Sequence, residues 1–241
     1  MSGTPAMPSV SGAINFRDTG GLPAGASHSR PGVLFRSGNL FGLDGDGRST
    51  LRELGLRRVI DLRDDAEVAL EPSRLDDVPV ATQRVPLFAG SVASFLRDGM
   101  SLPAMYRSIA EESAPRVVEV VRGVLADQPV LVHCTIGKDR TGVTIALLLA
   151  AAGVDEDAVV ADYAVTETLL PAERNARVVA WLRSQHPDSR DLEILATRSP
   201  APVMRGFLDD LRERYGAPGD YLRAHGLADD EIAELRRILV V

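Results

Sequence analysis

Short apolar runs alternate with longer segments of helical period over the first 154 residues of the chain. Four short segments bounded by turn residues predict strands, at residues 33–36, 57–62, 81–85 and 130–133. Between them, apolar residues at helical spacing predict a helix before Gly55, another from Pro103 to Leu125 with an interruption at Pro115, and a third from Thr141 to Gly153. Strands that alternate with helices form a mostly parallel sheet covered on both faces. We therefore expect an α/β fold with a central, mostly parallel sheet flanked by helices.

The chain beyond Asp155 contains helical segments and no predicted strand. Apolar spacing and proline breaks predict helices at residues 155–168, 172–185, 188–197, 202–215 and 229–239. This is more helix than a sheet needs for cover, so we expect residues 155–215 to form a helical lid. Residues 1–12 are rich in Ser, Gly and Pro, and we expect them to be mobile. A length of 241 residues without an internal repeat or linker predicts one domain over residues 1–241.

Composition and charge exclude several classes of protein. The formal net charge is −7 and the basic residues form no cluster, so we expect no nucleic-acid partner. The longest apolar stretch, residues 143–154, is shorter than the stretch of about 20 residues that spans a bilayer, so we expect no integral membrane segment. The N-terminal residues have neither a basic start nor an apolar run, which argues against a signal peptide. A single cysteine suits a reducing compartment, and we expect a cytoplasmic protein.

The segment from His133 to Gly142, HCTIGKDRTG, joins a predicted strand to a predicted helix. It holds the only cysteine, Cys134, and the only lysine, Lys138, and five residues separate Cys134 from Arg140. A loop that wraps onto a helix N-terminus points backbone N–H groups into one concavity, where the helix dipole adds positive charge. Such a concavity binds a phosphate dianion and favours the thiolate form of a cysteine at its base. The spacing therefore predicts a nucleophilic Cys134 within a phosphate site.

Each position of this loop has an expected task. Arg140 can hold two phosphoryl oxygens bidentately, and Thr141 can donate a hydrogen bond to the sulfur in the second step of the reaction. We expect His133 behind the loop, where it orients the cysteine. Gly137 permits a backbone conformation that a side chain would block. Substrate-binding groups are therefore expected at Thr135, Ile136, Gly137, Lys138 and Thr141.

The loop resembles the signature of protein tyrosine phosphatases, and particularly of the bacterial cysteine-dependent tyrosine and phosphoinositide phosphatases of the mycobacterial PtpB type. Further segments resemble this family in order and approximate spacing: NFRD at 15–18, LFRS at 34–37, DLR at 61–63, VADY at 160–163 and YLR at 221–223. The resemblance implies a tyrosine-phosphatase-like fold with a helical C-terminal lid. It also implies metal-independent hydrolysis of phosphotyrosine, extending in some members to phosphoserine, phosphothreonine and phosphoinositides.

The general acid of such a reaction stays open between two aspartates. Ordinary tyrosine phosphatases carry a Trp-Pro-Asp sequence that is missing here, and the family resemblance implies that Asp139, inside the loop, takes the role. Asp61 is the second candidate, because it lies at the C-terminal end of a predicted parallel strand, where ligand sites of α/β sheets form. Arg63 lies just past that strand and can position Asp61 or the substrate, and the resemblance places Tyr106 near the pocket. Lys138 adds positive charge suited to lipid or inositol phosphates.

The leading hypothesis is a cysteine-dependent phosphatase that forms a phosphocysteine on Cys134. One alternative is a non-catalytic phosphate-binding module, which usually lacks the cysteine or the arginine. Another is sulfur transfer of the rhodanese kind, whose loop is commonly shorter. The histidines have no metal-ligand spacing, and we expect neither a metal nor another cofactor. Expected partners are phosphorylated proteins or phosphoinositides. The pattern indicates neither the preferred substrate nor the oligomeric state, and the resemblance leaves export by a non-classical route open.

Overall fold

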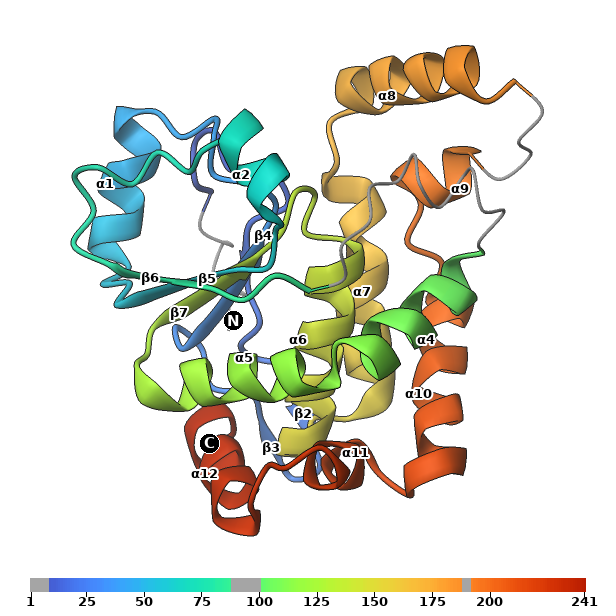
Figure 1. Cartoon of the computed structure of the whole chain (residues 1–241). Coiled ribbons are helices and arrows are strands. Elements are labelled where there is room, and N and C mark those ends of the chain that lie inside the picture. Colours follow the sequence, from blue (N-terminus) through green and yellow to red (C-terminus); the bar gives the residue numbers. More distant parts are fainter. Residues whose placement is uncertain (1–8, 88–100, 188–191) are drawn as a thin grey trace, which may run out of the picture.

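The computed structural model describes residues 9–87, 101–187 and 192–241 and shows a five-stranded sheet between two layers of helices (Figure 1). The strand order is β1 (Arg17–Asp18), β4 (Leu34–Ser37), β7 (Val130–His133), β5 (Arg58–Asp61) and β6 (Ala81–Arg84). The last four are parallel, whereas β1 runs antiparallel to β4. A separate hairpin pairs β2 (Pro23–Ala24) with β3 (Ser27–His28). The expected α/β fold with a mostly parallel sheet is confirmed.

Side chains along each central strand alternate between two cores, because successive residues of a strand point to opposite faces. Phe35, Val59 and Leu131 belong to the smaller core, which also contains Leu51 of α1 (Gly45–Glu53). Their neighbours in the same strands, such as Ile60, belong to the larger core on the other face. Because these strands are buried on both faces, their sequences are nearly continuous apolar runs and do not alternate between apolar and polar residues.

Helices cover the larger core. α6 (Asp139–Ala152) is buried along most of its length and packs against helices from both halves of the chain. The helices in contact with it are α4 (Leu102–Glu112), α5 (Ala114–Ala126), α7 (Glu156–Leu169), α11 (Pro218–Ala224) and α12 (Asp229–Leu239). α10 (Ala201–Tyr215) packs in turn against α4, α7 and α11. The central position of α6 fixes the loop that precedes it between sheet and helices.

Three further helices lie at the top of the view in Figure 1: α2 (Asp65–Leu70), α8 (Ala172–Gln185) and α9 (Leu192–Thr197). α8 packs against α9 and buries one residue, Leu182, while Trp181 on the same helix remains 56% exposed. α8 is therefore attached to the body through few apolar contacts.

Three predicted elements agree with the structure at both ends. The ranges 130–133, 172–185 and 229–239 coincide with β7, α8 and α12. The two-residue strands, α2 and α11 were not predicted. The helix expected at 188–197 is described from Leu192, and residues 188–191 lie outside the described residues. Of the segment expected to be mobile, residues 1–8 lie outside the described residues; of the rest, Val10 is buried in the smaller core and Ser9, Ser11 and Gly12 are exposed.

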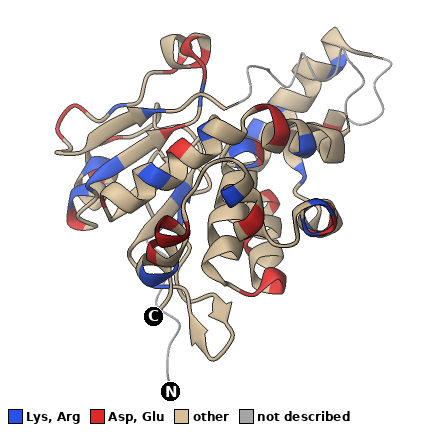
Figure 2. Cartoon of the chain, turned by 60° about the horizontal axis from the view of Figure 1, so that its bottom comes forward, with Lys and Arg blue, Asp and Glu red and all other residues tan. Residues whose placement is uncertain are grey.

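Charged residues of both signs are interspersed on the helices seen in Figure 2. Several pair between helices: Arg205 and Arg212 of α10 contact Glu156 of α7, and Arg214 of α10 contacts Glu111 of α4. These pairs join the C-terminal helices to the rest of the fold. Within the described ranges, no helix has the length and apolar character needed to cross a membrane.

Candidate active site

The loop between β7 and α6 lies at the carboxyl edge of the sheet. β4 and β7 end in register at Ser37 and His133, and the loop begins at Cys134. Gly137 takes a φ of +75°, and a Cβ atom at this position would lie 2.3 Å from the carbonyl oxygen of Ser37. Only glycine combines this backbone conformation with so close an approach to β4.

Cys134 lies at the base of the loop with 3% of its surface exposed. Its Sγ atom accepts a hydrogen bond from the backbone N–H of Gly137 at 3.3 Å. The N-terminus of α6 directly follows the loop and adds partial positive charge. Both contacts favour negative charge on the sulfur, the form that attacks phosphorus. The hydroxyl of Thr141 is buried without a hydrogen-bond partner among the described residues, which leaves its proton available to the sulfur or to a bound oxyanion.

Arg140 is held by a carboxylate from α2. Its Nη1 and Nη2 atoms donate to Oε2 and Oε1 of Glu67, each at 2.6 Å. Glu67 therefore occupies the far edge of the guanidinium, and within the described part of the chain no hydrogen bond involves Nε. Burial alone would lower the pKa of Arg140, but its hydrogen bonds to Glu67 and the charge on Cys134 raise it. The free Nε edge is the part of the arginine that can hold a phosphoryl oxygen.

Glu67 was not predicted as a site residue, although the sequence carries a helix-capping signal at this position. Asp64 and Glu67 form a capping box at the start of α2: the Asp64 side chain accepts the N–H of Glu67 at 2.8 Å, and Glu67 accepts the N–H of Asp64 at 3.0 Å. The hydroxyl of Thr135 also donates to Glu67. Burial would raise the pKa of Glu67, but its contacts with Arg140 and Thr135 lower it to about 2. Glu67 is thus a fixed anion that orients the arginine.

Polar side chains behind the loop hold its carbonyl groups. Asn15 donates to the carbonyl oxygens of Ile136 at 3.2 Å and Gly137 at 2.9 Å, and Arg36 donates to Gly137 at 2.9 Å. Asp162 of α7 pairs with Arg36 at 2.5 Å and with Arg17 at 2.8 Å. These bonds hold two carbonyl groups of the loop, while the N–H of Gly137 donates to the Cys134 sulfur.

Asp139, the first residue of α6, lies in a polar cluster of its own. Its Oδ1 atom accepts the hydroxyl of Tyr106 at 2.9 Å and lies 3.3 Å from Nζ of Lys138. The Tyr106 hydroxyl is 2.6 Å from the hydroxyl of Tyr163 on α7. The side chain of Asp139 retains 15% exposure, whereas Lys138 is fully buried. Tyr163 was not singled out from the sequence.

Lys138 reaches the C-terminal end of α9. Its Nζ atom lies 2.6 Å from the carbonyl oxygen of Leu195, 3.1 Å from that of Arg198 and 3.5 Å from that of Ile194. A cation at a helix C-terminus satisfies carbonyl groups that lack intrahelical partners. The sequence predicted a lysine directed at the substrate phosphate. In this structure its ammonium group instead docks α9 onto the loop.

The three remaining candidates form a buried layer beneath the loop. Asp61 accepts from the backbone N–H of Arg63 at 3.0 Å, from its Nε at 2.9 Å and from its Nη2 at 2.7 Å. Burial would raise the pKa of Asp61, but Arg63 and His133 lower it. Arg63 is fully buried and also donates to the carbonyl of Glu71 at 2.7 Å. Burial lowers the pKa of His133 to about 4, so the ring is neutral, and its Nδ1 lies 3.3 Å from the carbonyl oxygen of Cys134.

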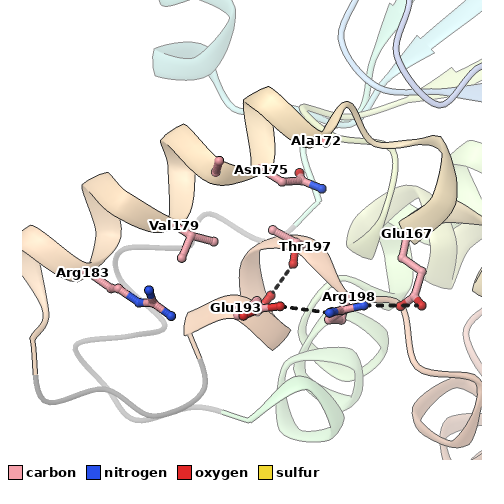
Figure 3. A pocket seen from close by; sticks show the side chains of 9 residues that line it. Glu167, Ala172, Asn175, Val179, Arg183, Glu193, Thr197 and Arg198 are labelled. Atoms are coloured by element: carbon pink, nitrogen blue, oxygen red, sulfur yellow. Dashed lines mark hydrogen bonds and ion pairs between the residues drawn. The ribbon is translucent and has the colours of Figure 1, made fainter.

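A cavity of about 340 Å³ separates α8 from α9 (Figure 3). Asn175, Val179 and Arg183 line it from α8, and Glu193 and Thr197 from α9. Across its floor, Arg198 lies 3.0 Å from Glu193 and 4.0 Å from Glu167 of α7. In the described ranges, no three His, Cys, Asp or Glu side chains are grouped as a metal site requires.

Comparisons with known proteins agree with this geometry. Residues 8–241 match the model of the tyrosine phosphatase family. The triple specificity protein phosphatase PtpB of Mycobacterium tuberculosis is 33% identical over 95% of this chain and 97% of its own. A tyrosine-protein phosphatase of Nostoc commune is 30% identical over 89% of this chain and 76% of its own.

Among solved structures, P. aeruginosa TpbA in complex with pTyr covers 81% of this chain and 96% of its own, with 19% identity and a TM-score of 0.41. The core catalytic domain of the PP-IP phosphatase SIW14 of S. cerevisiae covers 86% and 93%, with 17% identity and a TM-score of 0.42. The family match spans almost the whole chain and includes the loop, the helix and the arginine described above. The chain belongs to the tyrosine phosphatase family.

Proposed function

We propose that the protein hydrolyses phosphate monoesters of tyrosine, and also of serine, threonine and phosphoinositides, through a phosphocysteine on Cys134. The observation that carries this proposal is the hydrogen bond from the Gly137 N–H to the Cys134 sulfur at the N-terminus of α6. The triple specificity named for the M. tuberculosis relative supports the breadth of the substrate class. The expected partners are therefore phosphorylated proteins and phosphoinositides.

The reaction has two steps. The Cys134 thiolate attacks phosphorus and forms the S–P bond, the bond from phosphorus to the ester oxygen breaks, and Asp139 gives its proton to that leaving oxygen. Water then attacks phosphorus and returns a proton to Asp139, and the sulfur leaves as thiolate while phosphate is released. Loop N–H groups and Arg140 stabilise the charge on the equatorial oxygens in both transition states. The Thr141 hydroxyl, unpaired among the described residues, can donate to the departing sulfur.

We assign the acid role to Asp139 rather than Asp61. Three hydrogen bonds from Arg63 occupy both oxygens of Asp61, and this aspartate is 2% exposed. Asp139 is more exposed, and its contacts within the described residues all involve Oδ1. Its Oδ2 atom therefore remains to carry a proton. Asp61, Arg63 and His133 support the loop from beneath.

Replacement of the nucleophile tests the proposal. Cys134→Ser should abolish hydrolysis of p-nitrophenyl phosphate and retain vanadate binding, because serine keeps the shape of the loop but is not ionised at neutral pH. Undiminished turnover by this variant would contradict the mechanism. A native protein that binds vanadate without any turnover would instead be a non-catalytic binding module. Phosphotyrosine peptide, phosphothreonine peptide and monophosphorylated phosphoinositides, assayed in parallel, test the substrate range.

We also propose that residues 155–215 supply a lid, of which α8 and α9 are the parts that cover the site. The hydrogen bonds from Lys138 to carbonyl groups of α9 support this. A second support is Arg174 of α8, which lies close enough to Glu71 for their charges to interact. A cytoplasmic location is part of the same proposal, because a reducing compartment preserves a nucleophilic thiol. Cell fractionation tests the location.

A further inference from the structure

Two tyrosines from different helices form a hydrogen-bonded chain that ends on Asp139. Tyr106 comes from α4, Tyr163 from α7 and Asp139 from α6. The distances are 2.6 Å between the two hydroxyl oxygens and 2.9 Å from the Tyr106 hydroxyl to Oδ1 of Asp139. Both tyrosines are fully buried. A buried polar chain of this kind holds its members in one arrangement when every hydroxyl has a partner.

Each tyrosine hydroxyl carries one proton, and this fixes which group donates in each hydrogen bond of the chain. Burial and the nearby Asp139 charge raise the pKa of both tyrosines, so each hydroxyl keeps its single proton. Tyr106 uses its proton toward Oδ1 of Asp139, which accepts it as a carboxylate oxygen and also as the carbonyl oxygen when Oδ2 carries a proton. The proton between the two hydroxyls must then come from Tyr163. Tyr163 therefore donates to Tyr106, and Tyr106 donates to Asp139.

Packing holds the rings in place. The rings of Tyr106 and Tyr163 meet edge to face, with centroids 6.0 Å apart and an interplanar angle of 89°. Tyr106 meets Phe207 of α10 in the same way at 6.3 Å. On α6, a Cβ atom at Gly142 would lie 3.0 Å from Cδ2 of Tyr163. The glycine that ends the loop motif thus allows Tyr163 to reach the hydroxyl of Tyr106.

We propose that Tyr106 and Tyr163 are positioning residues that select the oxygen of Asp139 carrying the catalytic proton. Oδ1 is occupied by the Tyr106 hydroxyl and faces the Lys138 ammonium group. The proton is therefore carried on Oδ2, and the two tyrosines fix the rotation of the carboxyl group that aims Oδ2 at the leaving oxygen. This inference rests on the proposed role of Asp139 as the general acid.

The dependence of rate on the leaving group tests it. Proton donation matters for an ester with a basic leaving oxygen, such as phenyl phosphate, and matters little for 2,4-dinitrophenyl phosphate, whose leaving group departs as an anion. Because kcat/KM reports only the first step, in which the leaving group departs, Tyr106→Phe should lower kcat/KM for phenyl phosphate about tenfold and leave kcat/KM for the dinitrophenyl ester within about twofold. Tyr163→Phe should show the same selectivity with a smaller loss, about threefold, because Tyr106 retains its bond to Asp139.

Tyr221→Phe is the matched control. It removes another buried tyrosine hydroxyl, one that donates to the carbonyl of Ala110 on α4 at 2.6 Å and not to Asp139. This variant should show no difference between the two esters. Equal losses on both esters in Tyr106→Phe and Tyr163→Phe, or no loss at all, would overturn the inference. If Tyr106→Phe fails to fold, the inference is tested by whether Tyr163→Phe loses more activity on phenyl phosphate than on the dinitrophenyl ester.

Asp139→Asn separates this inference from the proposed function. A large loss on phenyl phosphate alone supports Asp139 as the acid, and unselective tyrosine variants would then overturn only the positioning role. Equal rates of Asp139→Asn and native enzyme on phenyl phosphate would overturn the acid assignment and the inference together. The Cys134→Ser result is independent of both.

Discussion

The side chain of Glu67 has two separate roles. It closes the capping box that begins α2, and it fixes the far edge of the Arg140 guanidinium with two bonds of 2.6 Å. The same carboxylate thereby connects the first turn of α2 to the arginine of the proposed phosphate site. Because Glu67 already holds one edge of the guanidinium, the arginine side chain loses little further freedom when a ligand binds at the other edge.

Glu67→Gln should lower activity without unfolding α2. Glutamine can still close the capping box, but its neutral amide cannot hold both Nη atoms of Arg140. We expect kcat/KM for p-nitrophenyl phosphate to fall about 10- to 100-fold, together with weaker vanadate binding. Steady-state kinetics and vanadate titration measure both. Glu234→Gln, which breaks an exposed pair with Arg237, is the control and should leave both values unchanged. Full activity of Glu67→Gln would contradict the orienting role.

Residues of the site differ in how far the sequence could predict them. Five residues lie between Cys134 and Arg140, and their chemistry follows from that spacing on a strand-loop-helix segment. Asn15 and Gly137, by contrast, are 122 residues apart, and nothing in either local sequence indicates their contact. Lys138 was predicted at the phosphate, because the sequence could not show that the end of α9 would supply three carbonyl groups around it.

At the scale of elements, apolar content decided which ones were predictable. β7 and α12 bury regular sets of apolar residues and coincide with their predicted ranges. α2 buries none of its residues, so it has no apolar period, and its only signal is the capping box. β1 has two residues and is too short for an alternating pattern. Hydrophobic patterning therefore misses β1 and α2, which carry Arg17 and Glu67, but finds α6 and α7, which carry Arg140 and Asp162.

α9 depends on Lys138 for its place on the loop. Lys138→Met keeps most of the side-chain length but removes every hydrogen bond to the carbonyl oxygens at the end of α9. We expect amide hydrogen exchange in residues 192–197 to quicken about tenfold, while exchange in α6 stays the same.

Arg198→Met is the control for this change. It removes a cation from the same region but leaves the Arg198 carbonyl available to Lys138. Exchange in α9 should remain at the native rate in this variant. Equal exchange rates in native protein and Lys138→Met would show that α9 is held by other contacts.

At the scale of the whole molecule, the loop is held by the two halves of the chain. Arg17, from β1, and Asp162, from α7, are 145 residues apart and meet behind the loop together with Arg36. The pKa of Arg17 is lowered to about 10 by burial and by Arg36, and Asp162 opposes that shift. Two buried arginines thus depend on one carboxylate.

Asp162→Asn should be strongly destabilising, because it leaves both arginines buried without a balancing charge. We expect the free energy of unfolding to fall by about 3–5 kcal/mol, measured by urea denaturation. Asp220→Asn, which breaks an exposed pair with Arg223, is the matched control and should cost at most about 1 kcal/mol. Similar losses in the two variants would show that the buried cluster is not a main support of the fold.

The bonds between Lys138 and α9 have a consequence for chemical labelling. Because Lys138 is the only lysine, an amine-directed acylating reagent has one side-chain target in the chain. That target is fully buried while α9 is docked, so acylation proceeds only from molecules in which the helix has moved away. An acylated lysine has lost its charge and gained bulk, and it cannot dock again. The extent of modification at one mass-resolved position would therefore count the events in which α9 leaves Lys138, with no engineered probe.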